Sequence, residues 1–201
     1  MILFLMLLVF QDSDEFEDDW VTVEPPRIGA RIKMPRRPVF TENAFQPVHE
    51  QAEIVLRTRS AEMPGGKATL TFEYHDEHDA ARNRRQIDAV LDGAITGAIA
   101  LVNGDLVTQN EVFEKNFKGR DFIYKCELDD AKLQKTHKLT IRSRVILVKE
   151  RLYSMNYIAE DEAYDDKVAE RFFKSFELIK TRGDAPPKPR AGRARELAES
   201  K

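Results

Sequence analysis

Apolar and polar residues alternate along several stretches of the chain, which is the period of a β-strand with one buried face. The alternation is clearest at residues 52–57 and 68–74, which are separated by Met-Pro-Gly-Gly at 63–66. Pro-Gly and Gly-Gly pairs are typical of tight turns. We therefore predict a β-hairpin that places Phe72 and Tyr74 on the core face or at its rim.

Other extended segments are predicted on both sides of this hairpin. Ordered structure is predicted to begin near Trp20, and a short strand at 28–35 ends at a turn fixed by prolines. After the hairpin, strands are predicted at 106–117, 120–128 and 138–158.

Turn residues divide these later segments. Gly119 is the predicted turn between the first two, and a tight reversal at Lys149 and Glu150 divides the third. Residues 145–148, Val-Ile-Leu-Val, form a continuous apolar run, which predicts a central strand covered on both faces.

A helical period replaces the alternation at about residues 79–102, where apolar residues recur every three or four positions. Gly93 and Gly97 lie on this helix, and we predict that their lack of a side chain lets it approach a sheet closely. Asn103 and Gly104 supply the predicted C-terminal stop.

A second amphipathic helix is predicted at 161–176. Tyr164, Val168, Phe172 and Phe176 are four residues apart and form its apolar face. Strands grouped in runs, with only two long helices, favour an α+β fold with a mostly antiparallel sheet rather than a repeated β-α-β plan.

Charge is distributed unevenly along the 201 residues. Residues 1–19 carry six acidic and no basic side chains, residues 180–201 carry seven basic and three acidic ones, and the whole chain has a formal charge of −3. We therefore predict an apolar leader and acidic spacer at 1–19, a single α+β domain at 20–179 and a flexible basic tail at 180–201. The nearly neutral domain lacks the basic face that binding to nucleic acid requires.

Residues 1–10 are all apolar, which matches the length of the hydrophobic region of a secretory signal but is too short to span a bilayer. A positive N-terminal region and a small-residue cleavage site are both missing. We interpret the segment as a clipped or mis-started signal peptide or a membrane tether, with a strand or helix of the core as the alternative. Location in the periplasm or cell envelope is therefore expected, rather than in the cytoplasm.

Four motifs, taken in their order and spacing, resemble the PsbP-like α/β/α sandwich. This fold is shared by the Ran-binding nuclear import factor and many bacterial exported domains of unknown function. The motifs lie at 29–35, 118–122, 144–153 and 170–176, and the resemblance spans residues 20–179. It implies a binding or assembly scaffold without a shared active site, so no catalytic residue is carried over. The tails differ from those of plant PsbP.

One cluster contains residues able to bind a metal at close spacing. His75, Asp76, His78 and Asp79 fall within five residues, and two imidazoles with flanking carboxylates can ligate zinc. The competing interpretation is an ordinary N-cap by Asp76 or Asp79 where a strand meets a helix. No third ligand at a recognised spacing follows, so no metal, cofactor-binding or catalytic residue is assigned. Whether His75 and His78 bind metal stays open.

Basic side chains offer a second hypothesis. Arg82, Arg84 and Arg85, together with Arg142 and Arg144, would form a patch for an anionic partner, unless they are simply solvated. The basic tail is a candidate for loose contact with an anionic surface.

The remaining candidate residues have structural interpretations. Cys126 is the only cysteine, which excludes an intrachain disulfide, and we interpret it as a small buried residue. Ser175 lies within a helical stripe, and His49 and His137 are isolated. The sequence contains no Gly-x-Ser-x-Gly nucleophile motif and no phosphate-binding glycine loop.

These observations favour a non-catalytic exported or envelope-associated binding or assembly module. Its partner would be a protein or a small molecule, with membrane contact only through the N-terminal apolar segment if that segment is retained. Two alternatives stay open: a small metal-dependent hydrolase using the cluster from His75 to Asp79, and a cytosolic chaperone-like assembly factor.

Overall fold

The computed structural model describes residues 20–26, 28–45, 54–76, 84–130 and 135–179. The strands in these ranges are β1 (Trp20–Val23), β2 (Ala30–Pro35), β3 (Val39–Phe45), β4 (Ile54–Glu62), β5 (Ala68–Asp76), β6 (Asp105–Glu114), β7 (Phe117–Asp130), β8 (Lys135–Val148), β9 (Arg151–Glu160) and β10 (Glu177–Leu178). The helices are α1 (Arg84–Leu101), the 3₁₀ turn η1 (Asp161–Ala163) and α2 (Asp166–Lys174).

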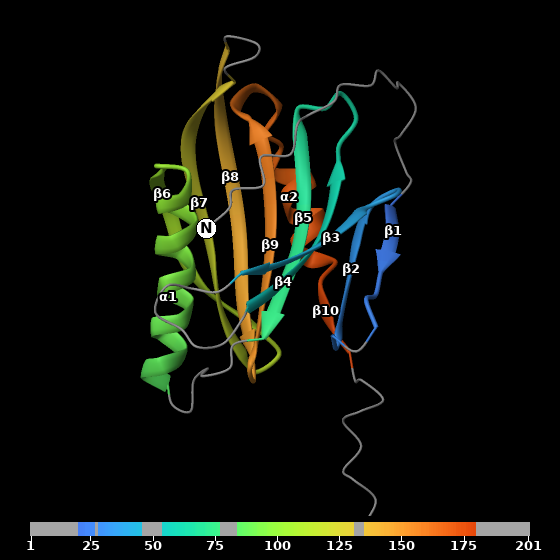
Figure 1. The fold of residues 1–201 in the computed structure, drawn as a ribbon, viewed down its shortest axis with the longest axis vertical. Helices are drawn as coiled ribbons and strands as arrows, with labels where there is room; N and C mark the ends of the chain where they lie inside the picture. Colours follow the sequence, from blue (N-terminus) through green and yellow to red (C-terminus); the bar gives the residue numbers. More distant parts are fainter. Residues whose placement is uncertain (1–19, 27, 46–53, 77–83, 131–134, 180–201) are drawn as a thin grey trace, which may run out of the picture.

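Seven strands form one antiparallel sheet in the order β3-β4-β5-β9-β8-β7-β6 (Figure 1). Tight hairpins join β4 to β5, β6 to β7 and β8 to β9. Their turns place Gly65, Gly66, Lys115 and Lys149 at positive φ, a conformation that tight hairpin turns require. The predicted hairpin at 63–66 and the reversal at Lys149 are confirmed.

One face of this sheet is covered by α2 and by a small antiparallel sheet of order β1-β2-β10 (Figure 1). The core between them is rich in aromatic rings. Phe72 stacks with Tyr153 at a centroid separation of 6.2 Å, and Phe176 packs against both rings. Phe172 and Phe173 of α2 are fully buried here. The predicted inward aromatic face of the second helix is confirmed.

The opposite face carries α1, which lies over β7 and β8 (Figure 1). Leu91 and Ile95 of α1 are buried against Phe122, Tyr124 and other apolar side chains of the two strands. Along β8, Val145 and Leu147 belong to this second core, whereas Ile146 belongs to the first. The prediction of a central strand covered on both faces is therefore correct, as is the α+β class.

Several sequence-based boundaries were wrong. β3 and β10 were not predicted. α1 is described from Arg84, and the predicted helix start near residue 79 lies outside the described residues. The second helix is split, because η1 precedes an α-helix whose N-cap is Asp165, with its carboxylate accepting the backbone N–H of Lys167 at 2.7 Å. The N-terminal leader and the basic tail lie outside the described residues.

Gly119 does not form a turn. It lies inside β7, opposite Ile146 of β8, and the β6–β7 turn is at Lys115 and Asn116. A Cβ atom on Gly119 would press on the carbonyl oxygen of Val145 and stand 2.9 Å from Cγ1 of Ile146. This glycine is therefore needed for the close approach of β7 to β8.

Gly93 and Gly97 do not contact the sheet. A Cβ atom built at either position meets no heavy atom within 4 Å, and both residues are exposed. The prediction that they let α1 lie close to the sheet is wrong, because the approach is made by the face that carries Leu91 and Ile95.

Substitution by alanine is predicted to have opposite effects on the free energy of unfolding at Gly119 and at Gly93. Gly119→Ala should lower the free energy of unfolding by about 1–3 kcal/mol, because the added methyl group clashes with β8. Gly93→Ala should raise it by about 0.5–1 kcal/mol, because alanine is the better helix former and the site is open. Urea denaturation followed by circular dichroism measures both changes. A neutral Gly119→Ala would contradict the tight β7–β8 contact.

Candidate functional site

The predicted metal cluster is only partly within the described residues. His75 and Asp76 end β5, and the Asp76 carboxylate accepts a hydrogen bond from Nε of Arg151 at 2.6 Å. His78 and Asp79 lie outside the described residues. Among the residues that the structure describes, no three His, Cys, Asp or Glu side chains are grouped to hold a metal ion. Asp76 therefore orients an arginine.

Arg142 and Arg144 are the members of the predicted arginine patch whose side chains the structure describes. α1, which is described from Arg84, covers one face of the sheet, whereas Arg142 and Arg144 contact the Phe173 ring of α2 on the other. Both arginines are paired with Asp121, at 3.0 and 2.7 Å, and Arg142 also pairs with Glu170. Arg82 lies outside the described residues.

The isolated candidates have structural contacts. Cys126 is buried beneath α1, and burial raises the pKa of its thiol, which disfavours the reactive thiolate. The Ser175 hydroxyl donates to the Phe172 carbonyl oxygen at 2.7 Å and accepts the backbone N–H of Lys33, so it joins α2 to β2. His137 lies 2.7 Å from a carboxylate oxygen of Glu160. His49 is outside the described residues.

A row of polar side chains crosses the sheet on the α1 side. Ser143 donates to the side-chain oxygen of Asn156 at 2.7 Å, and the Asn156 amide donates to Thr71 at 2.8 Å. Burial raises the pKa of the neighbouring Glu73, partly offset by His75 and Asn156, and burial also raises the pKa of Tyr124 to about 12. Because the Ser143 hydroxyl donates to an amide oxygen and not to a base, it is not activated as a nucleophile.

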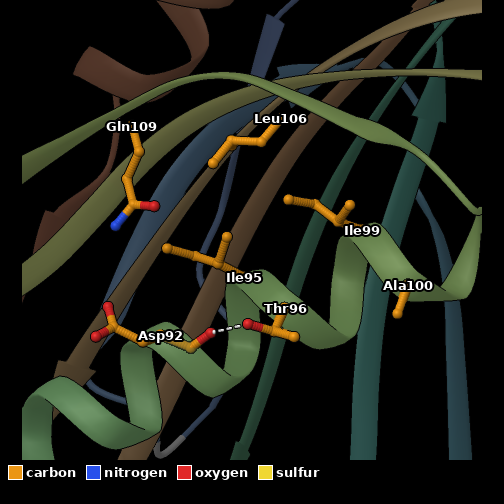
Figure 2. A pocket seen from close by; sticks show the side chains of 7 residues that line it. All are labelled: Asp92, Ile95, Thr96, Ile99, Ala100, Leu106 and Gln109. Carbon is orange, nitrogen blue, oxygen red and sulfur yellow. Dashed lines mark hydrogen bonds between the residues drawn. The ribbon is translucent and has the colours of Figure 1, made fainter.

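A groove of about 330 Å³ lies between α1 and β6, and we call it the α1–β6 groove. Figure 2 shows Ile95 and Ile99 of α1 facing Leu106 of β6, with Asp92 and Gln109 at one end. Thr96 and Ala100 complete the lining. The groove therefore has an apolar floor and a polar end, which is typical of ligand-binding surfaces.

Exposed apolar side chains lie at the end of α1 and along β6. Seven large apolar side chains are exposed in the described part of the chain, and four of them lie at the end of α1 or on β6: Leu101, Leu106, Val107 and Phe113. Phe113 is the most exposed, at 63%. Grouped apolar exposure of this kind marks interaction surfaces more often than scattered exposure does.

An ion-pair cluster fixes the acidic end of the groove. Lys118 of β7 lies 2.6 Å from Asp88 and 2.5 Å from Glu111, and Arg120 lies 2.7 Å from Asp88 and 3.3 Å from both Asp92 and Glu111. The two cations are largely buried, with side chains 13% and 10% exposed, whereas the carboxylates of Asp88, Glu111 and Asp92 are 32%, 41% and 55% exposed. The cluster joins α1, β6 and β7.

Sequence reasoning missed this site. β6 carries only the adjacent Leu106 and Val107 and the pair Val112 and Phe113 as large apolar residues, so its alternation is weak. An apolar pair next to polar residues on the strand predicted at 106–117 was the available signal. The groove itself depends on where α1 lies, which the sequence pattern does not specify.

Comparison with solved structures finds similar folds at low sequence identity. The solution structure of cyanobacterial PsbP (CyanoP) from Synechocystis sp. PCC 6803 matches with a TM-score of 0.48 and 10% identity, over 80% of this chain and 93% of that chain. PA94, a protein of unknown function from Pseudomonas aeruginosa, matches with a TM-score of 0.35 and 8% identity, over 72% and 85%.

No family model matches the sequence. No curated protein matches it either. None of the helices in the described ranges is both long and apolar enough to cross a membrane.

The ion-pair cluster predicts a pH-dependent contribution of Asp88 to stability. Hydrogen bonds from Lys118 and then Arg120 lower the pKa of this carboxyl below its ordinary value of 3.8. Its stabilisation is therefore fully present above that value and is lost as the pH falls through the lower folded-state pKa. Asp88→Asn should lower the urea midpoint at neutral pH, and the difference from the unmodified protein should shrink below about pH 4.

Glu127→Gln is the matched control. Glu127 pairs with Lys138 at 3.5 Å, and both side chains are more than 60% exposed, so its loss should change the midpoint little at any pH. A pH-independent effect of Asp88→Asn would show that the carboxylate charge is not what stabilises the cluster.

Proposed function

We propose that this protein is a non-catalytic binding module that holds a polypeptide segment of a partner in the α1–β6 groove. The observation that carries the proposal is the exposure of Leu106, with its neighbour Val107, at a groove floored by Ile95 and Ile99. Phe113 is exposed further along the same strand. Leaving large apolar side chains in water forfeits about 1.5–3 kcal/mol each relative to full burial. A partner that covers them regains part of that free energy.

The surroundings of the groove support a rigid binding surface. α1 is anchored by Leu91 and Ile95 in the second core and by the pairing of Asp88 with Lys118 and Arg120. A surface held from two sides loses little conformational entropy when a partner binds. A polypeptide suits this site, because the groove lies between α1 and the exposed strand β6 (Figure 2).

Export belongs to the same proposal. It is supported by the ten apolar residues at 1–10 and by the acidic spacer that follows them. A binding module without an active site would act in the periplasm or cell envelope by holding or assembling another protein.

Peptide selection on the full chain tests the binding role. Selection from a random ten-residue phage library should enrich peptides whose affinity falls by at least about tenfold in Leu106→Asp, because the charge would have to be buried in the groove. Val39→Asp is the matched control, since Val39 is 54% exposed on the edge strand β3 at the other end of the sheet. Enriched peptides that bind Leu106→Asp unchanged, or a failure to enrich any, would contradict the proposal.

Cell fractionation tests export. The full chain carrying a C-terminal tag, expressed in a Gram-negative host, should be recovered in the periplasmic or membrane fraction. Changing Leu5 and Leu7 to aspartate should retain it in the cytosol, because charges interrupt the apolar segment. Recovery of the unmodified chain only in the cytosol would favour the cytosolic assembly factor.

A further inference from the structure

We propose that the segment bound in the α1–β6 groove is extended and basic and joins the outer edge of β6 as an additional strand. This inference rests on the proposed function and names the class of partner. Two features of β6 lead to it: its edge position and the surplus of acidic side chains around it.

β6 is an edge strand of the seven-stranded sheet. Its neighbour among the described strands is β7, and the other side of β6 faces outward. A register shift between Leu106 and Thr108 interrupts the ladder, but residues 108–114 pair with β7 without a break. These seven residues span about 23 Å at 3.3 Å per residue. Their outward N–H and C=O groups form a template for an added strand.

β6 lacks two of the common protections of a sheet edge, because proline and lysine are absent from its ten residues. It does carry three carboxylates and a bulge, but the bulge lies at one end rather than in the middle, and Glu111 pairs with Lys118 and Arg120. The other edge strand, β3, differs. The guanidinium of Arg59 on β4 covers the Phe40 ring of β3 at 4.1 Å, and Arg57 of β4 pairs with Glu42 at 2.7 Å.

The side chains of β6 determine which residues of an added strand would fit beside them. Gln109, Glu111 and Phe113 lie opposite Phe122, Arg120 and Lys118, on the face that α1 covers. Alternate side chains of an added strand would point to the same face, beside these three residues and the mouth of the groove. Apolar residues suit the positions next to Phe113 and near Leu106, and a basic residue suits the position next to Glu111.

The charges around β6 favour a basic segment over an acidic one. From Gln86 to Glu114 the chain carries Asp88, Asp92, Asp105, Glu111 and Glu114 and no Lys or Arg. Lys118 and Arg120 are largely buried and paired with these carboxylates. Of the other cations near β6, Lys115 donates from Nζ to the carbonyl oxygen of Leu178, and Lys125 pairs with Asp161. An approaching cation therefore meets carboxylates that are more exposed than the cations paired with them, which favours its association, and an acidic segment would be repelled.

A designed peptide tests this inference on the full chain. Fluorescein-labelled Val-Thr-Arg-Thr-Leu-Thr-Val places apolar and basic residues on alternate positions of one face, and fluorescence anisotropy measures its affinity. Two N-methylated forms, one methylated at odd and one at even positions, separate strand addition from other binding. Only alternate amides of an added strand bond to the edge, so one form should lose at least about tenfold in affinity and the other should retain it.

Supporting measurements use the same peptide. Replacing its arginine by glutamate should weaken binding at least about tenfold at low salt, and hydrogen exchange of amides within 108–114 should slow when the peptide binds. Val39→Asp should leave all of these results unchanged.

The contrary outcomes are distinguishable from one another. Equal affinity of the two N-methylated forms, with binding still lost in Leu106→Asp, would overturn strand addition while the binding role stands. If sedimentation shows a dimer that dissociates when the peptide is added, the occupant would be a second copy of this chain. This chain's own C-terminal residues would be the occupant if the peptide binds more tightly after four basic residues are changed to glutamine: Lys188, Arg190, Arg193 and Arg195.

Discussion

The structure depends on β8, which is buried on both faces and paired on both sides. Val145 and Leu147 point into the core beneath α1, and Ile146 points into the core shared with α2 and β2. Because strand side chains alternate, a shift of one residue would exchange these two sets, so that each would face the core that the other now fills. The pairing of β8 with β7 and β9 therefore fixes which face each layer covers.

The two layers cover the sheet differently. The β1-β2-β10 sheet and α2 lie over β5 and β9 and bury a continuous aromatic core, whereas α1 lies mainly over β7 and β8. β6 extends beyond this cover and remains largely exposed. The α1–β6 groove follows from this offset, and the pairing of Asp88 and Asp92 with Lys118 and Arg120 holds α1 in place beside it.

The polar row on the α1 side of the sheet illustrates the difference between a perturbed group and an active site. Glu73 has a raised pKa because it is withdrawn from water, and Ser143, Asn156 and Thr71 satisfy one another in a chain of hydrogen bonds. Raised pKa values arise at structural networks as well as at catalytic sites. Here the hydroxyl groups contact an amide rather than a base, so the binding interpretation rests on the groove and not on this row.

The sequence by itself determined the local elements whose pattern is strong: the hairpin at 63–66, the doubly covered run at 145–148 and the aromatic face of α2. Tight turns and side-chain periodicity are set by residues close in the chain, so a pattern is sufficient to predict them. Only the tertiary structure decided that Gly119 lies against β8, that Gly93 and Gly97 face away from the sheet, and that Leu106 and Phe113 stay uncovered. Each of these depends on which distant segment packs nearby, and apolar periodicity shows that a face is buried without showing what buries it.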